Sequence, residues 1–381
     1  MGRVSWLAIP LMLLALAGAG QAIAARRALR RLAATRAPAG PPLAASVLKP
    51  LHGNEMGLAD NLAATLDQAH APPWEVLFGA ADPADAARPI AGAAMAASAT
   101  PARFLAGGAV LGANRKVSQL VHLAAEARHP ALVVADADMR CPRDWLTAVT
   151  APLADPGTGL VTCLYRGEAA DGGTWSRLAA LGIDWHFLPN AALGESLGQA
   201  QGCYGATMAL RRDTLERIGG FEPLLPLLAD DHALGAAVRR LGLRVEVSPV
   251  IPVHVMHEPD LRALWAHELR WARTLRLLNF PGFLGLGLTH PLPWALLALA
   301  VAPGAWTLGV LAIALGARLA LASGVDSALG VAGGWRRRAW LPARDLLSFA
   351  VWLTALARGG VVWRGRRYRI GRDGEMVEEA R

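Results

Sequence analysis

The pattern of apolar and polar positions divides the chain into a mixed middle and two apolar ends. Residues 4–25 form an uncharged apolar run of about the 20 residues that a helix needs to cross the hydrocarbon core of a bilayer. Residues 283–301 and 306–322 form two more apolar runs on either side of Pro303-Gly304. They predict a hairpin of two membrane spans joined by a tight outer turn. Arg318 lies in the second span, and we expect its side chain to extend toward the membrane interface.

Two further segments near the C-terminal end have more than one interpretation. Residues 346–362 are apolar, but Arg358 interrupts them and both flanks are basic. This segment is expected to span the membrane, to re-enter it or to lie in its interface. Residues 261–278 combine tryptophans and many arginines in an amphipathic pattern. That pattern is typical of a helix on a membrane surface or of a helix packed on the domain.

Residues 43–280 alternate between short strand patterns and helical patterns. This alternation predicts an α/β domain with a mainly parallel sheet. The predicted strands cover residues 46–48, 74–78, 131–135 and the strand-like stretch 245–255, and the predicted helices cover residues 58–68, 116–128 and 232–241. Ligands bind beyond the carboxyl ends of the strands in open sheets of this kind. Asp82 and the pair Asp136 and Asp138 follow predicted strands and are therefore candidate site residues.

The net charge of +8 is concentrated at the two ends of the chain. Residues 1–40 contain six arginines and no acidic residue, and residues 335–381 contain eleven arginines and five acidic residues. The middle of the chain is therefore mildly acidic, which argues against a nucleic-acid-binding surface. Three widely spaced cysteines without a C-x-x-C pattern exclude a disulfide framework and a cysteine-based zinc site.

The arginines that follow the first apolar run indicate its orientation. Arg26, Arg27, Arg30 and Arg31 come directly after the run, and clusters of this kind remain on the cytoplasmic side. Residues 4–25 are therefore predicted to be an anchor with its N-terminus outside and residue 26 onward inside. The alternative is a cleaved signal peptide, because Ala22-Ile23-Ala24 resembles a cleavage site. A periplasmic enzyme would then be released.

The acidic motifs are the candidates for chemistry. Asp136 and Asp138, two positions apart in a loop, can both reach a hard divalent cation and its bound phosphates, or they can cap the helix predicted near Pro142. Asp230 and Asp231 precede another predicted helix, where acidic residues are also favoured by the helix dipole alone.

Basic and aromatic residues supply the other candidate contacts. Arg270 beside Trp271 can offer a phosphate contact and a stacking face. Lys116 is a candidate diphosphate contact, with a solvated surface lysine as the alternative. His254 and His257 are three positions apart at the end of the strand-like stretch, and a metal role is not favoured for them because a complete set of metal ligands is missing.

The order of these motifs resembles the D, DxD, D, (Q/R)xxRW pattern of family 2-like glycosyltransferases. It is more similar to the ceramide glucosyltransferase family and its bacterial relatives of the hopanoid pathway. The resemblance covers nearly the whole chain and is carried by Ser46 to Gly53, Asp82-Pro83-Ala84-Asp85, Gly112 to Lys116, Gly202 to Phe221, Leu228 to Asp231, His267 to Trp271, and Trp363 to Arg369. The first position of (Q/R)xxRW is His267, a departure that leaves a phosphate contact or a structural role open for this residue.

The resemblance implies a GT-A fold, a mainly parallel α/β architecture, and inverting transfer from a UDP-sugar to a lipid hydroxyl. It implies that Asp231 is the catalytic base and that Asp82 contacts the uracil. It further implies that Asp136 faces the nucleoside and that Asp138 faces a divalent metal, Mn or Mg, on the diphosphate. Arg270 and Trp271 would hold the diphosphate and the acceptor edge of the donor site. Asp230 and His267 are further possible site residues.

The expected organisation follows from the resemblance and the apolar runs together. Residues 1–40 would form the anchor and its arginine collar, residues 41–280 the cytoplasmic catalytic domain, residues 281–363 a membrane region of two to three helices, and residues 364–381 a basic cytoplasmic tail. The expected location is the bacterial inner membrane. The expected acceptor is a hopanoid polyol that receives N-acetylglucosamine, with ceramide and glucose as the alternative. A non-catalytic transport or scaffold protein is the interpretation from a different class.

Overall fold

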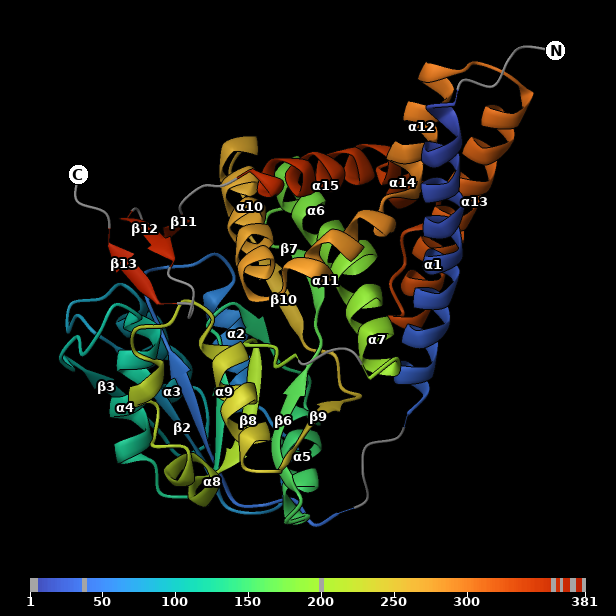
Figure 1. Cartoon of the computed structure of the whole chain (residues 1–381). Helices are drawn as coiled ribbons and strands as arrows, with labels where there is room; N and C mark the ends of the chain where they lie inside the picture. The colour runs from blue at the N-terminus through green and yellow to red at the C-terminus, as the bar shows by residue number, and fades with distance from the viewer. Residues whose placement is uncertain are drawn as a thin grey trace.

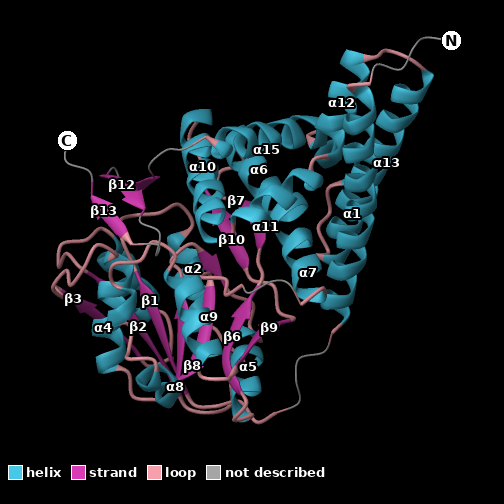
Figure 2. Ribbon diagram, viewed as in Figure 1, coloured by secondary structure: helices cyan, strands magenta, loops and turns pink. Residues whose placement is uncertain are grey.

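A computed structural model describes residues 6–35, 40–198, 202–357, 361–363, 366–370 and 375–378. It consists of an α/β domain and a group of helices from both ends of the chain that stands against one side of that domain (Figure 1). Figure 2 shows that the strands are confined to the α/β domain and to a small sheet near the C-terminus. The expected α/β architecture is confirmed.

A mixed sheet of seven strands forms the centre of the domain. Its order is β3-β2-β1-β4-β8-β6-β9. The strands are β1 (Ala45–Pro50), β2 (Trp74–Ala80), β3 (Ala102–Ala106), β4 (Ala131–Ala135), β6 (Thr158–Cys163), β8 (Thr207–Arg211) and β9 (Arg244–Ser248). Strand β1 pairs in parallel with β2 and with β4, while β8 is antiparallel to β4 and β6. The loops after β1, β2 and β4 therefore leave the sheet at the same edge.

Helices cover both faces of this sheet and make it the middle of three layers. One face packs on α2 (Leu58–Leu66), α3 (Ala87–Ala96), α5 (Trp145–Thr150) and η1 (Ala151–Ala154). The other face packs on α4 (Arg115–Glu126), α8 (Arg212–Arg217), η3 (Glu222–Leu224) and α9 (Asp230–Arg240).

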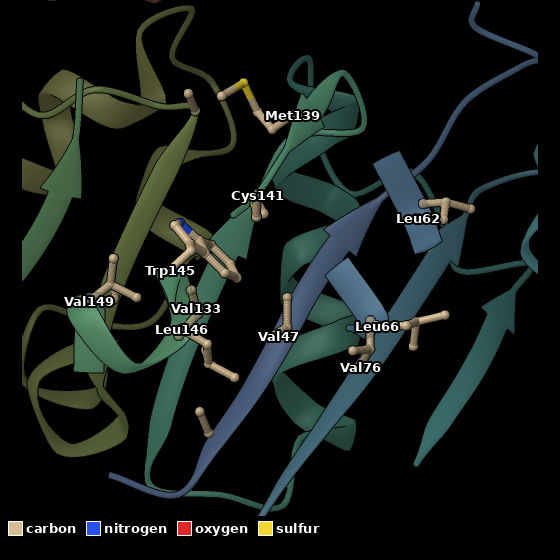
Figure 3. Close-up of a cluster of buried hydrophobic side chains, with 14 of the residues drawn as sticks. Val47, Leu62, Leu66, Val76, Val133, Met139, Cys141, Trp145, Leu146 and Val149 are labelled. Carbon is tan, nitrogen blue, oxygen red and sulfur yellow. The ribbon is translucent and has the colours of Figure 1, made fainter. Parts of the chain in front are cut away.

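The first of these faces carries a tightly buried core (Figure 3). Val47 on β1 and Val133 on β4 are fully buried in one cluster with Leu62 from α2 and Trp145 from α5. Burial of each such apolar side chain stabilises the fold by roughly 1.5–3 kcal/mol. This packing holds β1 and β4 rigidly, and with them the loops at their carboxyl ends.

A second sheet of three strands lies beyond the carboxyl edge of the first. It has the order β5-β10-β7 and consists of β5 (Met139–Arg140), β10 (Val253–Met256) and β7 (Arg166–Ala169). The single strand-like stretch predicted over residues 245–255 is therefore wrong, because β9 and β10 belong to different sheets. Pro249 and Pro252 separate them, and proline cannot donate to a central sheet ladder.

Three consecutive helical segments connect the domain to the apolar helices. They are α6 (Thr174–Gly182), the π-helical turn η2 (Ile183–Phe187) and α7 (Leu188–Ser196). Trp185 of η2 and Leu188 of α7 are buried in a cluster with Leu29 of the first helix and Leu321 of a later one. The domain and the apolar helices thus share one hydrophobic core.

Two helices of the described chain are long and apolar enough to cross a membrane by themselves, α1 (Ala8–Ala34) and α13 (Ala305–Ala328). Helix α1 continues without a break through the arginine cluster and packs on α13 and on α12 (Pro291–Val301). The turn at Pro303-Gly304 between α12 and α13 confirms the predicted hairpin turn.

The predicted span over residues 283–301 is not one continuous helix but a bent pair, which is either a broken span or a re-entrant segment. The chain forms α11 (Phe280–Gly285), η4 (Leu286–Thr289) and then α12, with a bend of 67° between the two parts. Pro291 lies at the bend, where its ring and missing amide hydrogen prevent a continuous helix.

The last two helices are α14 (Gly334–Arg338) and α15 (Leu341–Leu356). Helix α15 has 16 residues and runs across the apolar helices rather than along them (Figure 1). Of the segment 346–362, residues 346–356 are helical, and whether this helix spans the membrane, re-enters it or lies in its interface stays a prediction; Arg358 lies outside the described residues. Helix α10 (Leu261–Leu278) packs on α15 and α6, as expected for a helix packed on the domain.

Buried ion pairs join these helices. The guanidinium of Arg318 in α13 donates to both carboxylate oxygens of Asp345 in α15, at 2.8 and 2.7 Å, and both side chains are almost completely buried. The expected extension of Arg318 to the interface is therefore wrong, because its counter-ion lies inside the protein. Arg344 of α15 donates to both carboxylate oxygens of Glu268 in α10, at 2.6 and 2.7 Å, and to the carbonyl of Leu178 in α6 at 2.9 Å.

The C-terminal segment, expected to be a basic tail, contains a small antiparallel sheet. Its strands are β11 (Val361–Trp363), β12 (Arg366–Ile370) and β13 (Met376–Glu378). The amide of Met376 donates to the carbonyl of Pro226 at 2.8 Å, in the loop that leads to α9. Strand β13 thus lies beside the loop that leads to Asp230 and Asp231.

Candidate active site

The acidic residues that follow β2 and β4 lie at one edge of the central sheet. Asp82 follows β2, and Asp136 and Asp138 follow β4, with β1 between the two strands. Neighbouring strands are about 4.8 Å apart, so the ends of β2 and β4, which lie on either side of β1, are roughly 10 Å apart. Neither Asp136 nor Asp138 caps α5, which begins after Asp144 without a side-chain cap. The capping interpretation of this pair is therefore wrong.

Asp138 forms a partly buried pair with His254. Its Oδ2 lies 2.9 Å from Nε2 of His254, which β10 brings to the loop. Burial by itself raises the pKa of Asp138, but the charge and hydrogen bond of His254, together with Lys49 and Lys116, lower that pKa to about 2. Within the described chain, Oδ1 of Asp138 is buried and has no hydrogen-bond partner. One carboxylate oxygen of this pair is therefore available to a ligand.

Lys116 connects Asp136 to the second acidic motif. It stands in the first turn of α4, and its Nζ lies 2.7 Å from Oδ1 of Asp136 and 3.6 Å from Oδ2 of Asp230. Burial works to lower the pKa of Lys116, but the two carboxylates outweigh it and raise that pKa above its usual range. The ammonium group therefore stays charged, as a phosphate contact requires. The alternative of a solvated surface lysine does not fit these contacts.

Lys49 holds the loop that follows β4 in place, and the sequence alone did not identify it as a site residue. It is fully buried in β1, and its Nζ donates to the carbonyls of Asp136 and Met139 at 2.8 and 3.2 Å. Burial lowers the pKa of Lys49. The available signal was its position: one of the two lysines of the chain stands inside an apolar strand directly before Pro50. A buried lysine in that position requires specific acceptors.

Asp230 and Asp231 form the first turn of α9 and have different surroundings. Asp230 accepts from Nδ2 of Asn114 at 3.3 Å and faces Lys116. Asp231 accepts from the backbone amides of His232 at 2.7 Å and Gly205 at 3.0 Å. Burial, with the nearby charge of Asp230, raises the pKa of Asp231 to about 6.

Gly205 allows Asp231 to approach the backbone this closely. A Cβ atom at Gly205 would lie 2.9 Å from Oδ2 of Asp231, closer than side chains pack. A carboxylate with a pKa near neutral pH in a site of this kind can act as a general base.

Helix α10 brings Arg270 and Trp271 to the Asp138 side of the site. The centroid of the Trp271 ring lies 6.1 Å from that of the His254 ring. Burial lowers the pKa of Arg270, and the negative charges of Asp138 and Glu258 oppose that shift. His267, at the departing position of the (Q/R)xxRW pattern, pairs through Nδ1 with Oε1 of Glu258 at 2.6 Å. The ring of His267 also packs edge-on against the ring of Trp271, with 4.4 Å between the ring centroids. These contacts position Trp271, while a phosphate contact by His267 stays a prediction.

Asp82 stands apart from these clusters. It is exposed, and its Oδ1 accepts from the amide of Ala84 at 2.8 Å within its own turn. Asp85 is the buried member of the same motif and accepts from the amide of Gly53 at 2.8 Å, which ties the loops after β1 and β2 together. The uracil contact implied for Asp82 remains a prediction.

The side chains around Asp138 offer part of the ligand set that a divalent cation needs. No group of three or more His, Cys, Asp or Glu side chains in the described ranges is placed to hold a metal ion by itself. Oδ1 of Asp138 supplies one oxygen ligand, and Nε2 of His254 can supply a nitrogen ligand once it has given up its proton and its hydrogen bond to Oδ2. These residues fit a cation that takes its remaining ligands from a bound diphosphate or from water. His254, for which the sequence indicated only a strand position, thereby joins the site, while His257 instead faces Asp171 at 3.5 Å.

Comparison with solved structures shows a shared glycosyltransferase fold. The chain is similar to the mannosyltransferase from Pyrobaculum calidifontis solved with GDP-Man and Mn2+, with 19% identity, a TM-score of 0.50, and coverage of 91% of this chain and 99% of that one. It is also similar to GalNAc-T7 with UDP, GalNAc and Mn2+ (12% identity, TM-score 0.43, 62% and 49% covered). A third structure is glucosyl-3-phosphoglycerate synthase from Mycobacterium tuberculosis (19% identity, TM-score 0.40, 61% and 79% covered).

The family comparison covers nearly the whole chain. The family described as Glycosyl transferase family 21 matches residues 10–376, which include α1, the α/β domain, the apolar helices and the C-terminal sheet up to β13. The GT-A-like fold expected from the sequence is therefore confirmed, and the chain belongs to glycosyl transferase family 21.

Proposed function

We propose that this protein transfers a sugar from a UDP-sugar to a hydroxyl group of a membrane lipid. The observation that carries the proposal is Asp231, a partly buried carboxylate with a raised pKa, in the same charged cluster as Lys116 and the Asp136–Asp138 loop. Membership of family 21 supports an enzyme over a transport or scaffold protein. The acceptor that we favour is a hopanoid polyol receiving N-acetylglucosamine; ceramide receiving glucose is the alternative and is also consistent with the family.

Each of the site residues has its own proposed role in the reaction. Asp231 would accept the proton of the acceptor hydroxyl, so that its oxygen can attack the anomeric carbon of the donor. Lys116 and Arg270 would bind the diphosphate of the donor and then of the departing nucleotide, with Trp271 at the edge of the sugar. Asp138 and His254 would hold a divalent cation, Mn2+ or Mg2+, which stabilises negative charge on the leaving diphosphate. Asp136 would face the nucleoside and hold Lys116 in position.

The apolar helices support a membrane location for the acceptor. Helix α1 packs on α13 over its length and on α7 of the domain, so cleavage after Ala24 would remove most of a packed helix. This packing favours an anchor over a cleaved signal peptide. The arginines at its end favour a cytoplasmic position for the catalytic domain, at the inner membrane of a bacterium.

The substrates can be tested with enriched membranes. Each member of a panel of UDP-sugars is incubated with bacteriohopanetetrol or with ceramide, and the products are read by mass, with membranes that lack the protein as the control. We expect an N-acetylhexosamine adduct of the hopanoid polyol. A hexose adduct of ceramide would establish the alternative. No product from either acceptor would contradict the lipid part of the proposal and leave the family assignment unaffected.

The rate of transfer is expected to fall in acid through Asp231. A base must be ionised, and with a pKa of about 6 only about a tenth of the Asp231 groups are ionised at pH 5. We therefore expect kcat at pH 5 to be about tenfold lower than at pH 7, measured under saturating substrates. A raised pKa means that protonation of this group favours the folded state, so acid unfolding does not arise from Asp231. A rate that stays constant down to pH 4.5, with the melting temperature unchanged, would contradict this role.

A further inference from the structure

A cavity of about 370 Å³ opens between α1 and α13, near the end of both helices that adjoins the α/β domain. Its polar lining consists of Arg26 and Arg30 from α1 and Ser323 and Ser327 from α13, and small residues, among them Gly324, form the rest. Each polar pair is four residues apart, so both members of a pair project from the same face of their helix. No residue that lines the cavity is acidic.

Arg26 has a polar atom in this region without a partner. Its Nε is buried and makes no hydrogen bond with any of the residues that the structure describes. Leaving a buried polar atom of a charged group unsatisfied is costly, and an anion can remove that cost. Arg30 is exposed on the next turn of the same face. Two guanidinium groups therefore face one cavity without a carboxylate in its lining.

Gly324 makes room for the Arg26 side chain. A Cβ atom at this position would lie 2.5 Å from Nε and 2.6 Å from Cγ of Arg26, so any other residue there would displace the arginine. The hydroxyl groups of Ser323 and Ser327 stand on either side of this glycine in the sequence and can both donate hydrogen bonds. Guanidinium and hydroxyl donors around one cavity are a set that suits phosphate oxygens.

The position of the cavity along the helices decides which phosphate it suits. Arg26 follows directly after the apolar run of α1, and Ser323 to Ala328 form the last turns of α13. Exposed apolar side chains continue from this level along both helices, for example Leu16 on α1 and Ile313 on α13. The cavity thus lies where the headgroups of a bilayer meet its hydrocarbon core, and basic pockets between membrane helices at that depth bind anionic headgroups.

We propose that this cavity is a binding site for the phosphate of an anionic membrane phospholipid. The inference rests on the membrane placement proposed above and does not depend on the sugar-transfer reaction. The lipid would pair with Arg26 and Arg30 and join α1 to α13 at the face of the bilayer that adjoins the catalytic domain. It is therefore a structural lipid, separate from the acceptor.

Lipid binding by the purified full-length protein tests the proposal without a sugar donor. Delipidated protein in detergent is titrated with phosphatidylglycerol or phosphatidylcholine, and bound lipid is counted by native mass spectrometry. We expect the double variant R26Q/R30Q to bind phosphatidylglycerol about thirtyfold more weakly, given roughly fivefold for each basic residue near an anionic headgroup. The matched control is R27Q/R31Q, which removes the same charge at two exposed positions of the same helix and should bind as the unaltered protein does.

A third variant separates shape from charge. Gly324→Leu keeps every charge but displaces Arg26, and we expect it to lose the preference for phosphatidylglycerol as R26Q/R30Q does. Equal weakening in R27Q/R31Q would show that the arginines act as a diffuse collar and would overturn the proposal. Displacement of the lipid by inorganic phosphate alone, at equal concentration, would overturn it in favour of a free-anion site. The catalytic proposal survives both of these outcomes.

Discussion

Replacing Asp231 with asparagine is expected to lower kcat for sugar transfer by about 10²–10⁴-fold, the range typical for loss of a general acid or base. Asparagine has nearly the same shape, but it cannot take the proton of the acceptor hydroxyl. Binding of the donor should change little, because Lys116, Asp138 and Arg270 are untouched. KM for the UDP-sugar should therefore stay within about threefold, so that the loss appears in kcat.

The fold is expected to tolerate this change. Burial disfavours the ionised form of Asp231, as its raised pKa shows, and asparagine is neutral. Its single carbonyl oxygen can keep one of the two backbone hydrogen bonds from Gly205 and His232. The melting temperature should therefore remain close to that of the unaltered protein.

The matched control is Asp213→Asn. Asp213 also stands in the first turn of a helix, α8, but its side chain is 66% exposed. That variant should keep full activity. If Asp231→Asn transferred the sugar as fast as the unaltered protein, Asp231 would not be the catalytic base. The acid limb of the pH profile should also vanish from whatever residual activity Asp231→Asn retains.

Replacing Asp345 with leucine is expected to destabilise the protein by about 3–5 kcal/mol, the range for breaking a buried ion pair. The change leaves the buried guanidinium of Arg318 without its counter-ion, and a buried charge without a partner is strongly unfavourable. The nitrogen Nε2 of His186, 3.0 Å from Asp345, would lose a partner as well. Thermal unfolding of the purified protein, followed by the loss of its monodisperse gel-filtration peak, measures the effect.

Two further variants isolate the cause. Replacing both partners, as Arg318→Met with Asp345→Leu, should recover much of the lost stability, because apolar groups of similar volume can substitute for a buried pair. Breaking the exposed pair of Arg244 and Asp155, each 56% exposed, by Asp155→Ala should lower the melting temperature far less, because water screens exposed charges. If Asp345→Leu costs no more than Asp155→Ala, the buried pair does not hold α13 to α15.

Local patterns in the sequence predicted the elements whose cause is local. Helix α10 has the predicted bounds of residues 261–278, because its amphipathic period is complete and Asp260 caps it by accepting from the amide of Ala263. Strand β4 also has its predicted bounds, since a short run of buried apolar residues ends at the acidic loop. The family resemblance, read from motifs in order along the chain, indicated the fold and is confirmed by the family comparison.

Contacts between distant positions could not be predicted in this way. His254 reaches Asp138 across 116 positions, because β10 leaves β9 and enters a second sheet. The sequence showed only a histidine in an apolar stretch. Arg318 and Asp345 belong to separate helical patterns, and nothing in either pattern indicates that the two helices cross. Lys49 could be identified as unusual, but its acceptors are carbonyl groups, which no side-chain pattern reveals.

The contact of Arg344 with two helices has a consequence for how an acceptor reaches the site. One guanidinium joins α15 to α10 through Glu268 and to α6 through the carbonyl of Leu178, and α10 carries Arg270 and Trp271. Movement of α10 or α6 relative to α15 would therefore have to break these contacts. A lipid acceptor of the proposed kind would then reach Arg270 and Trp271 by lateral diffusion within the membrane, so that the search for it takes place in two dimensions.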